Sequence, residues 1–386
     1  MTIHGHPVQR ILAAFACLGV SVAVAQDVKD YVPKPGQFPP PNSGQYFAGE
    51  LVMVDPINRR GGIRLDGDDS GDLNANRYDK GDPLRFAMLP YGSIWYHGAL
   101  AELRDIPIGT HLHGYFYLPP EGDKSIPPPE GPPQLVPKQN HAISLQDDFS
   151  FYGRRGQAWK IVSVDLKAGK LKVASTGNAA ADGLKGEHTF EIDRATRIWK
   201  DRGFGVLEDL APEQVVQVGL DWDPDWENIH FHCADIWLNK ESLDVATEHQ
   251  RQIHLRYQRS HWLAGWIDHV QQQQAGPGIV TFTLFDGIDP TLCDEIRAKG
   301  KTHGFLIAVA EKTLRTYFHS SDNRGGAVVE IKQIENPPAG SSGIQLRVQV
   351  NEVLEGYRPG RIVRVRPHDW PGIKLPPEER AKSRDD

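Results

Sequence analysis

The sequence predicts a mainly β protein made of three tandem small antiparallel β-barrel modules, with one connecting α-helix between the second and third modules. Three observations support this fold class. The 386 residues include 38 glycines and 29 prolines, a content that favours a chain rich in turns. Short segments of alternating apolar and polar residues, typical of half-buried strands, recur along the chain. Two groups of these segments also repeat each other in order and spacing.

Residues 1–25 have the features of a secretory signal peptide. Arg10 supplies a positive charge, residues 11–22 form an apolar run, and Ala23-Val24-Ala25 matches a cleavage site. Twelve helical residues span only about 18 Å, which is shorter than the ~30 Å core of a bilayer. We therefore expect an exported protein, periplasmic or extracellular, with no transmembrane segment in the mature chain.

The charge of the expected mature chain excludes some classes of partner. Cleavage after residue 25 removes one basic and no acidic residue, which leaves 42 basic residues against 50 acidic ones and a net charge of −8. A mildly acidic chain does not favour general binding to nucleic acid or to anionic lipid. An envelope protein or a polysaccharide is the expected partner, and the sequence gives no indication of the oligomeric state.

Proline-rich segments divide the rest of the chain. Residues 26–46 are predicted to form an extended leader and residues 119–157 a proline-rich linker. The first small barrel is expected at 47–118 and the second at 158–229. The C-terminal residues 372–386 are expected to form a disordered tail.

The first two modules have matching strand patterns. The paired segments are Glu50–Asp55 with Lys160–Asp165, Ile94–Trp95 with Ile198–Trp199, and Leu103–Asp105 with Leu207–Asp209. Their constant spacing indicates a duplicated domain with a period of about 110 residues. Closure of each set of short strands into a barrel removes exposed sheet edges. Asp105 and Asp209 are expected to cap the turn before the last strand through backbone N–H groups.

A helix and a third module complete the predicted fold. Residues 230–260 are expected to be a linker that contains a helix over about Lys240–Arg259, with Asn239 as its N-cap. One stripe at helical spacing comprises Leu243, Ala246, Gln250, Ile253 and Tyr257. The third barrel, a looser copy, is predicted at 261–371. It carries an insertion, predicted as a short helix, at Pro290–Lys299.

The duplicated strands resemble the small OB-like or SH3-like barrel repeats of uncharacterised exported bacterial proteins. The string ADIWLNKES…TEHQRQ and the proline-rich leader resemble planctomycete proteins in particular. The resemblance covers residues 48–223, and 262–370 more loosely. It implies a barrel fold and assigns no catalytic residue, because small barrels of this kind serve many binding roles.

Two His-x-His pairs are candidate metal ligands. His111 and His113 lie in one predicted strand, and His230 and His232 lie close to Asp235. Residues i and i+2 of a strand face the same side, so each pair can offer two imidazoles to one Zn or Cu ion. The structural alternative is that these histidines simply occupy half-buried strand positions.

Two further segments are weaker candidates. The acidic loop Asp66–Asn74 begins like a calcium-binding loop, but Arg77 stands where a bidentate glutamate is needed. Trp222 and Trp226 alternate with carboxylates, a combination that can bind carbohydrate. The alternative is a strand end followed by a turn, in which the tryptophans cover the barrel.

Cysteine content leaves one possible disulfide. Cys17 belongs to the signal peptide, so the mature chain keeps Cys233 and Cys293. In an oxidising compartment these two can form a bond that closes a long loop. The alternative is two buried free thiols.

Motifs of several enzyme classes are absent from the sequence, including G-x-S-x-G, G-x-G-x-x-G and H-E-x-x-H. The duplication repeats strand-core residues without repeating a polar constellation. The sequence therefore predicts a non-catalytic, exported binding or scaffold protein of the cell envelope, with no assigned cofactor. Two alternatives remain open. One is a metal-binding protein or metal-dependent enzyme that uses His230, His232 and Asp235, and the other is a carbohydrate-binding module that uses Trp222 and Trp226.

Overall fold

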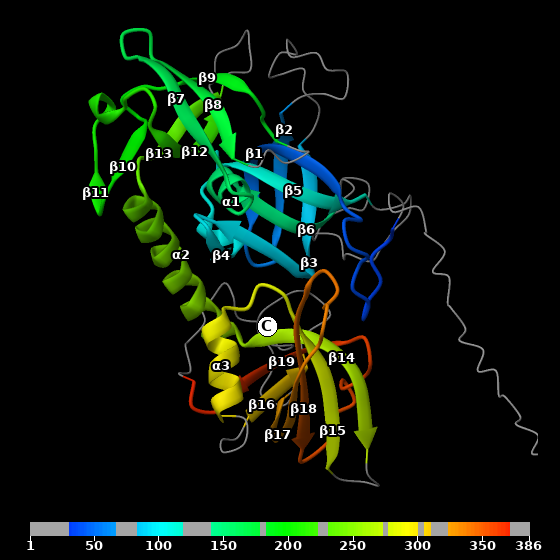
Figure 1. The fold of residues 1–386 in the computed structure, drawn as a ribbon. Helices are drawn as coiled ribbons and strands as arrows, with labels where there is room; N and C mark the ends of the chain where they lie inside the picture. The colour runs from blue at the N-terminus through cyan, green and yellow to red at the C-terminus, as the bar shows by residue number, and fades with distance from the viewer. Residues whose placement is uncertain are drawn as a thin grey trace, which may run out of the picture.

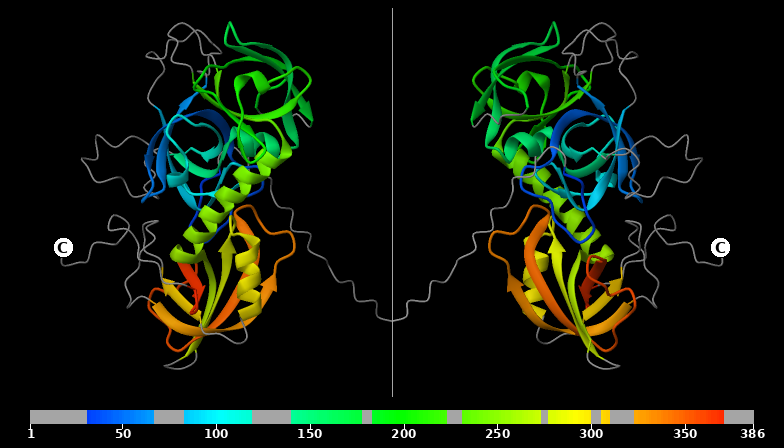
Figure 2. Two further views of the ribbon diagram at one scale, coloured as in Figure 1. Left: turned by 90° about the vertical axis from the view of Figure 1, so that its left-hand side faces the viewer. Right: turned by 90° about the vertical axis from the view of Figure 1, so that its right-hand side faces the viewer.

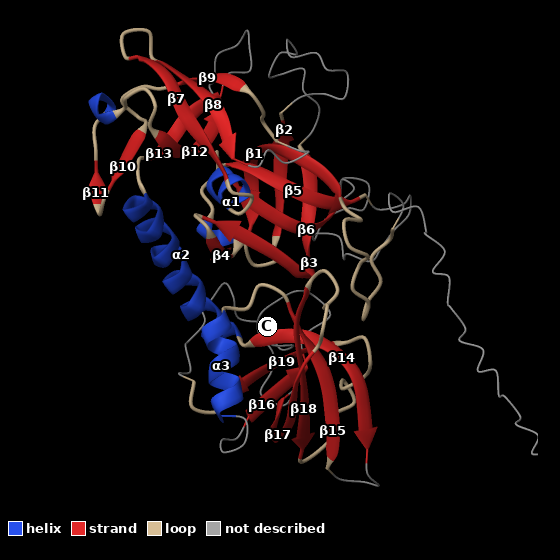
Figure 3. Ribbon diagram, in the orientation of Figure 1, coloured by secondary structure: helices blue, strands red, loops and turns tan. Residues whose placement is uncertain are grey.

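The computed structural model describes residues 31–66, 83–118, 140–177, 183–222, 231–272, 277–299, 305–309 and 323–370. These residues form three barrel-like sheets with helices between and beside them, which confirms the predicted fold class (Figures 1 and 3). The predicted signal peptide and C-terminal tail lie outside the described residues. No helix in the described ranges is both long and apolar enough to cross a membrane.

Barrel 1 is a sheet closed by the pairing of β2 with β3. Its strands are β1 (Gln45–Asp55), β2 (Arg60–Leu65), β3 (Leu84–Tyr96), β4 (Ala99–Ala101), β5 (His111–Tyr117) and β6 (Asn140–Asp147). The order is β2-β1-β5-β6-β3-β4, with β4 as a short addition to the end of β3. Alternating side chains fill its interior, and Leu51, Ile63 and Phe86 are fully buried.

Barrel 2 repeats this topology. Its strands are β7 (Gln157–Asp165), β8 (Lys170–Gly177), β9 (Glu187–Glu191), β10 (Arg197–Lys200), β11 (Gly203–Phe204), β12 (Val215–Trp222) and β13 (Phe231–Trp237). The order is β11-β10-β13-β12-β7-β8-β9, and a β13–β9 pairing closes it. The single β3 of barrel 1 corresponds to β9 and β10 here. Trp159, Ile161 and Val173 lie in its core.

Equivalent hydrogen bonds confirm the duplication. The Leu51 N–H donates to the Thr110 carbonyl at 2.9 Å, and the Ile161 N–H donates to the Gln214 carbonyl at 2.8 Å. Each copy then has a 3₁₀ turn at the equivalent place, Leu103–Asp105 and Leu207–Asp209.

The aspartates of these turns have the predicted capping role. Asp105 accepts a hydrogen bond from the Glu102 backbone N–H at 2.9 Å, and Asp209 accepts one from the Val206 N–H at 2.9 Å. In both copies the side chain satisfies a backbone donor that the turn leaves unpaired.

The structure differs from the predicted boundaries of both barrels. β6 lies within the expected linker 119–157, and β13 lies within the expected linker 230–260. Each is the strand that closes its barrel, and each runs parallel to a neighbour, β6 to β3 and β13 to β10. The first two barrels are therefore not wholly antiparallel. The sequence hides these strands because several of their buried residues outside the barrel cores are polar, among them His141, Gln146 and Asp235.

Each closing strand leads directly into a helix. β6 is followed by α1 (Asp148–Gly153), which the sequence does not predict, and β13 by α2 (Lys240–His261). The predicted N-cap of α2 is confirmed, because Asn239 Oδ1 accepts the Ser242 N–H at 3.0 Å.

The buried face of α2 differs from the predicted apolar stripe. It comprises Ser242, Gln250, His254, Leu255, Gln258 and His261. α2 contacts β4 of barrel 1 and β10 of barrel 2 and then runs on to barrel 3 (Figure 2). Polar partners along this path explain the polar face: the Gln250 amide, for example, donates to the Leu100 carbonyl at 3.2 Å.

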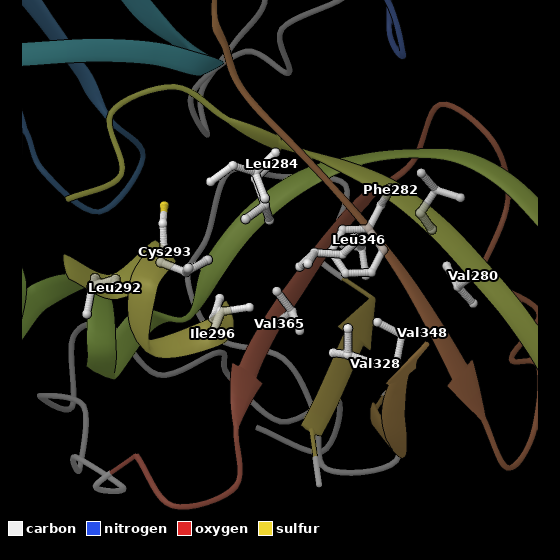
Figure 4. Packing of buried hydrophobic residues seen from close by; sticks show 14 of the residues in the cluster. Val280, Phe282, Leu284, Leu292, Cys293, Ile296, Val328, Leu346, Val348 and Val365 are labelled. Carbon is white, nitrogen blue, oxygen red and sulfur yellow. The ribbon is translucent and has the colours of Figure 1, made fainter. Parts of the chain in front are cut away.

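Barrel 3 is a closed six-stranded sheet. Its strands are β14 (Leu263–Gln272), β15 (Gly278–Phe285), β16 (Phe305–Val309), β17 (Asn323–Gln333), β18 (Ser341–Val350) and β19 (Ile362–Pro367). The predicted insertion helix is α3 (Pro290–Lys299). It places Leu292, Cys293 and Ile296 against the barrel core, beside Leu284 and Val365 (Figure 4).

The expected leader packs between two barrels. Tyr31 and Phe38 lie against an aromatic cluster that contains Tyr91 of barrel 1 and Trp266 and Phe285 of barrel 3. The Phe38 ring lies 5.5 Å from that of Tyr91 and 6.3 Å from that of Phe285. Residues 31–46 therefore help to join barrel 1 to barrel 3.

The two cysteines of the expected mature chain are free thiols rather than a disulfide. Cys233 lies in the core of barrel 2 and Cys293 in the core of barrel 3, so the two belong to separate hydrophobic clusters. Burial raises the pKa of Cys293 to about 11 and that of Cys233 well above its ordinary value. Both therefore remain protonated at neutral pH.

We expect both thiols to resist modification in the native protein, because buried thiols at neutral pH offer little thiolate to a reagent. In a chain that begins at Gln26, Ellman's reagent should detect almost no thiol under native conditions and two thiols per chain in guanidinium chloride. A count of zero after denaturation without reductant would indicate the disulfide instead.

Candidate functional site

The candidate site lies where β5, α1 and barrel 2 meet. His111 and His113 are alternate residues of β5, and both contact Asp148, the first residue of α1. Asp148 Oδ1 lies 2.8 Å from His111 Nδ1 and 2.9 Å from His113 Nε2. All three side chains are 1% exposed. The predicted convergence of the first His-x-His pair is therefore present, around a carboxylate that the sequence did not single out.

Two further side chains extend this cluster. His111 Nε2 lies 2.9 Å from Asp66 Oδ2, and His113 Nδ1 lies 2.8 Å from the Tyr46 hydroxyl. All four ring nitrogens of the two histidines thus have hydrogen-bond partners. We call Tyr46, Asp66, His111, His113 and Asp148 the Asp148 network.

The second oxygen of Asp148 connects barrel 1 to barrel 2. Asp148 Oδ2 accepts the backbone N–H of Leu220, on β12, at 2.8 Å. The β12–β13 ladder has a bulge between Gly219 and Leu220, which locally disrupts the regular pairing. The carboxylate therefore receives hydrogen bonds from both barrels.

One arrangement of protons satisfies every contact in the network. A carboxylate only accepts hydrogen bonds, so His111 donates to Asp148 and to Asp66 and is an imidazolium. His113 donates to Asp148 through Nε2 and accepts from Tyr46 through Nδ1, so it is neutral. In this arrangement each hydrogen bond of the two histidines has one donor and one acceptor.

The electrostatics agree with this assignment. Burial opposes the charge of His111, but Asp148 and Asp66 outweigh it and raise the pKa of His111 well above its ordinary value. Burial dominates at His113 and lowers its pKa. The pKa of Asp148 is lowered despite its burial, mainly because the His111 charge is close. The centre of the network is therefore a buried ion pair at neutral pH.

Aromatic rings enclose the two imidazoles. His113 is stacked on Phe151 of α1, with the ring centroids 3.7 Å apart and the planes 8° apart. Phe231, the first residue of β13, lies edge-on to His111 at 5.2 Å. The Arg155 guanidinium lies 3.7 Å from the centre of the Phe151 ring. Tight packing of this kind fixes the orientation of both imidazoles.

The donor set of the network is chemically suited to a transition metal. Two imidazoles and a carboxylate, His111, His113 and Asp148, form the group of potential ligands found among the described residues. Ligand atoms about 2.0–2.1 Å from a tetrahedral Zn²⁺ lie about 3.3 Å from one another. The nitrogen–oxygen distances here are about half an ångström shorter, as hydrogen bonds require. A metal would have to displace two protons and widen the cluster.

The residue that sequence analysis missed is Asp148. Its one signal is the pair Asp147-Asp148 at the end of β6, just before Phe149. Asp147 has the conventional role of N-cap, since its Oδ1 accepts the Ser150 N–H at 3.0 Å. Burial raises the pKa of Asp147 to about 7. Two adjacent acidic residues at a helix start suggest capping, and only the fold shows that one of them faces two histidines.

The second predicted metal cluster cannot be traced as a whole, because His230 lies outside the described residues, but His232 and Asp235 have different partners. His232 Nδ1 lies 2.8 Å from Asp221, and its Nε2 lies 3.1 Å from Asp193. Asp235 instead pairs with Arg197, at 2.6 and 2.7 Å, and accepts the Trp199 indole N–H. His232 and Asp235 therefore share no partner.

Several other candidate residues lie wholly or partly outside the described structure. His230, Trp226 and the calcium-like loop beyond Asp66 cannot be placed. Asp66 itself contacts His111, as described above. Trp222 is the last residue of β12 and pairs with Phe231 across the ladder.

Replacing Asp148 with asparagine should strongly destabilise the protein. The change removes the fully buried one of the two carboxylates that face the His111 imidazolium and places an amide N–H₂ near the Leu220 N–H. We expect a loss of about 3–5 kcal/mol of unfolding free energy, as for other broken buried ion pairs. Urea denaturation followed by tryptophan fluorescence measures this loss.

Asp66→Asn is the matched control for Asp148→Asn. The Asp66 side chain is 28% exposed, so water can compensate for the lost charge, and we expect a loss of about 1 kcal/mol. Equal losses for the two variants would contradict the central role of Asp148.

The contribution of His232 to stability should depend on pH. Its hydrogen bond to Asp221, reinforced by Asp193, outweighs its partial burial and raises its pKa above the ordinary 6.5 or so. A raised pKa stabilises the folded state fully below about pH 6.5, and this stabilisation is lost as pH rises through the folded-state pKa. The stability difference between wild type and His232→Gln should therefore be larger at pH 5.5 than at pH 9.

Denaturant titration at the two pH values measures this difference. NMR titration of the His232 ring should also give a folded-state pKa above 6.5. An equal or larger difference at pH 9 would refute the prediction.

Comparison with known proteins assigns no relative to this chain. A scan against models of protein families finds no match, and a search of curated proteins finds no significant similarity. The functional argument therefore depends on the geometry of the chain itself.

Proposed function

We propose that the protein is an exported, non-catalytic scaffold of the cell envelope, which presents three joined barrels to a binding partner. The observation that carries this proposal is the closed hydrogen bonding of the Asp148 network. Every polar atom of the two histidines already has a protein partner, and the shared carboxylate accepts from a second barrel. Such a network favours a role in holding barrels together over a role in turning over a substrate.

The other junctions support the same proposal. α2 contacts barrels 1 and 2 and leads into barrel 3, and the leader residues Tyr31 and Phe38 pack in the aromatic cluster between barrels 1 and 3. Because the barrels are joined at each junction, the surfaces of the three barrels keep a fixed position and orientation relative to one another. A fixed relation between surfaces is what a scaffold needs, because a preorganised binder loses less entropy on association.

The proposed type of barrel is OB-like. Five strands close each of the first two barrels, as in the small Greek-key barrels of that class. Barrels of this class bind oligonucleotides or oligosaccharides on one face, and the acidic charge of this chain favours the latter. A polysaccharide is therefore one of the two partners proposed, and an envelope protein is the other.

Metal binding by the Asp148 network is the second candidate function. It is favoured by one observation, the convergence of His111, His113 and Asp148 within ligand distance of one another. This would be a Zn or Cu site different from the one proposed at His230, His232 and Asp235, because His232 and Asp235 are engaged elsewhere. The network would then hold the ion, and Asp66 would orient His111.

Metal analysis and cross-linking together distinguish the two functions. For a scaffold, protein purified from its natural envelope should contain less than about 0.1 equivalent of Zn or Cu. A tagged chain, cross-linked in intact cells, should give one saturable product containing an envelope protein or polysaccharide. Excess untagged chain should compete for it, whereas an unrelated exported barrel protein should not.

Stoichiometric Zn or Cu that is lost in the His111→Gln, His113→Gln variant would establish the metal function instead. The Asp193→Asn variant, which changes a carboxylate beside His232 and leaves the Asp148 network intact, serves as the metal control. Absence of any saturable cross-linked product would refute the scaffold proposal.

A further inference from the structure

A second site lies at the junction of barrel 1, α2 and barrel 3. A pocket of about 80 Å³ is lined there by Arg59 and Glu102 of barrel 1, His254 and Tyr257 of α2, and Arg364 of barrel 3. One water needs about 10–15 Å³ of such space, so the pocket admits a ligand of only a few non-hydrogen atoms. It is separate from the Asp148 network, which joins barrels 1 and 2.

His254 is a buried polar side chain without a partner. It is 4% exposed, and neither Nδ1 nor Nε2 has a hydrogen bond to any described residue. The Gly287 carbonyl lies close enough to His254 to oppose the effect of burial on the His254 pKa, but it accepts the Gln258 amide at 2.7 Å and does not reach hydrogen-bond geometry with the ring. Burial lowers the pKa of His254 below its ordinary value, so the ring is neutral and offers one donor and one acceptor. An unpaired donor and acceptor at such a position each cost free energy unless a ligand satisfies them.

Arg364 brings an unpaired positive charge to the same pocket. Its Nη1 donates to the His261 carbonyl at 2.9 Å, while its buried Nε has no partner among the described residues. No described carboxylate lies within ion-pair distance of Arg364. Burial lowers the pKa of Arg364 and the nearby Arg59 charge adds to this effect, while Tyr257 and Glu102 oppose it.

The other charges around the pocket do not neutralise Arg364. Arg59 pairs with Glu102 at 3.1 Å and also donates to the Gly92 carbonyl at 3.0 Å. Asp286 lines the pocket but is exposed at its rim, and Arg104 lies over the Tyr257 ring at 5.1 Å. The interior therefore holds two guanidinium groups and one carboxylate, which leaves one positive charge.

We propose that this pocket binds a small oxyanion that also carries a hydroxyl group, either a short hydroxycarboxylate or hydrogen phosphate. The Arg364 guanidinium pairs with the anionic oxygens through its free Nε. His254 donates to one ligand oxygen and accepts the ligand hydroxyl proton. The unpaired atoms thus call for a ligand with an anionic oxygen for Arg364 and a hydroxyl group for His254. Acetate has the anionic oxygen but lacks the hydroxyl group.

Ligand binding at this position should stabilise the joint between barrels 1 and 3. The lining residues come from both barrels and from the helix that connects them, so a ligand that contacts all three favours their assembled arrangement. Any ligand that binds only the folded state raises its stability by mass action. A thermal shift is therefore an expected readout besides calorimetry.

The test compares glycolate with acetate, two carboxylates that differ by one hydroxyl group. Isothermal titration at pH 7 should give one glycolate site per chain, with a dissociation constant at least about tenfold lower than that of acetate. Phosphate should compete with glycolate. Arg364→Gln and His254→Phe should each weaken glycolate binding by tenfold or more, whereas Arg251→Gln should leave it unchanged. Arg251 is a matched control because it lies on α2 with the same charge but pairs with Asp289.

An NMR readout keeps the test decisive if a variant fails to fold. In the wild-type protein the His254 ring signals should shift on glycolate addition and saturate with the calorimetric dissociation constant. No heat and no shift at 50 mM glycolate or phosphate would overturn the proposal. So would equal effects of acetate and glycolate, or an equal loss of binding in Arg251→Gln, because either outcome would indicate general ionic attraction.

Discussion

The buried carboxylate of Asp148 is the interaction on which the joining of the first two barrels depends. It accepts hydrogen bonds from His111 and His113 on one oxygen and from the Leu220 N–H on the other. A carboxylate in an apolar surrounding is tolerated only when its charge and lone pairs are met. The imidazolium of His111 supplies the charge and barrel 2 supplies a donor, so neither barrel alone completes the arrangement.

Duplication explains why barrels 1 and 2 share a topology, and sequence divergence between the two copies explains the contact between them. The backbone hydrogen bonds of the two copies match around Leu51 and Ile161, so His111 and His113 occupy the strand positions of Val215 and Gln217. In barrel 2 the Gln217 amide donates to the Gln157 carbonyl at 2.6 Å. Both copies of this strand lie at the junction, since β12 contributes the Leu220 N–H, but only the copy in barrel 1 carries histidines that face Asp148. Two identical faces could not have formed this asymmetric contact.

The third barrel is joined by a different chemistry. Its contacts to barrel 1 are aromatic, through Tyr91, Trp266 and Phe285, with Phe38 inserted from the leader. Beside this dry cluster lies the pocket with unpaired polar atoms of His254 and Arg364. An apolar cluster gives stability without directional demands, whereas the pocket retains unsatisfied groups that specify a ligand. The polar groups of the Asp148 network, between barrels 1 and 2, thus have partners, whereas the pocket between barrels 1 and 3 leaves atoms of His254 and Arg364 unpaired.

The sequence by itself determined the local features: the duplicated strands, the capping aspartates, the start of α2 at Asn239 and the shared face of His111 and His113. These follow from side-chain periodicity and short-range hydrogen bonding, which act between near neighbours in the chain. Tertiary structure alone decided that β6 and β13 close the barrels, that Asp148 joins the two histidines, and that His232 and Asp235 separate. Each of these depends on contacts between residues far apart in sequence, whose energies no local pattern records.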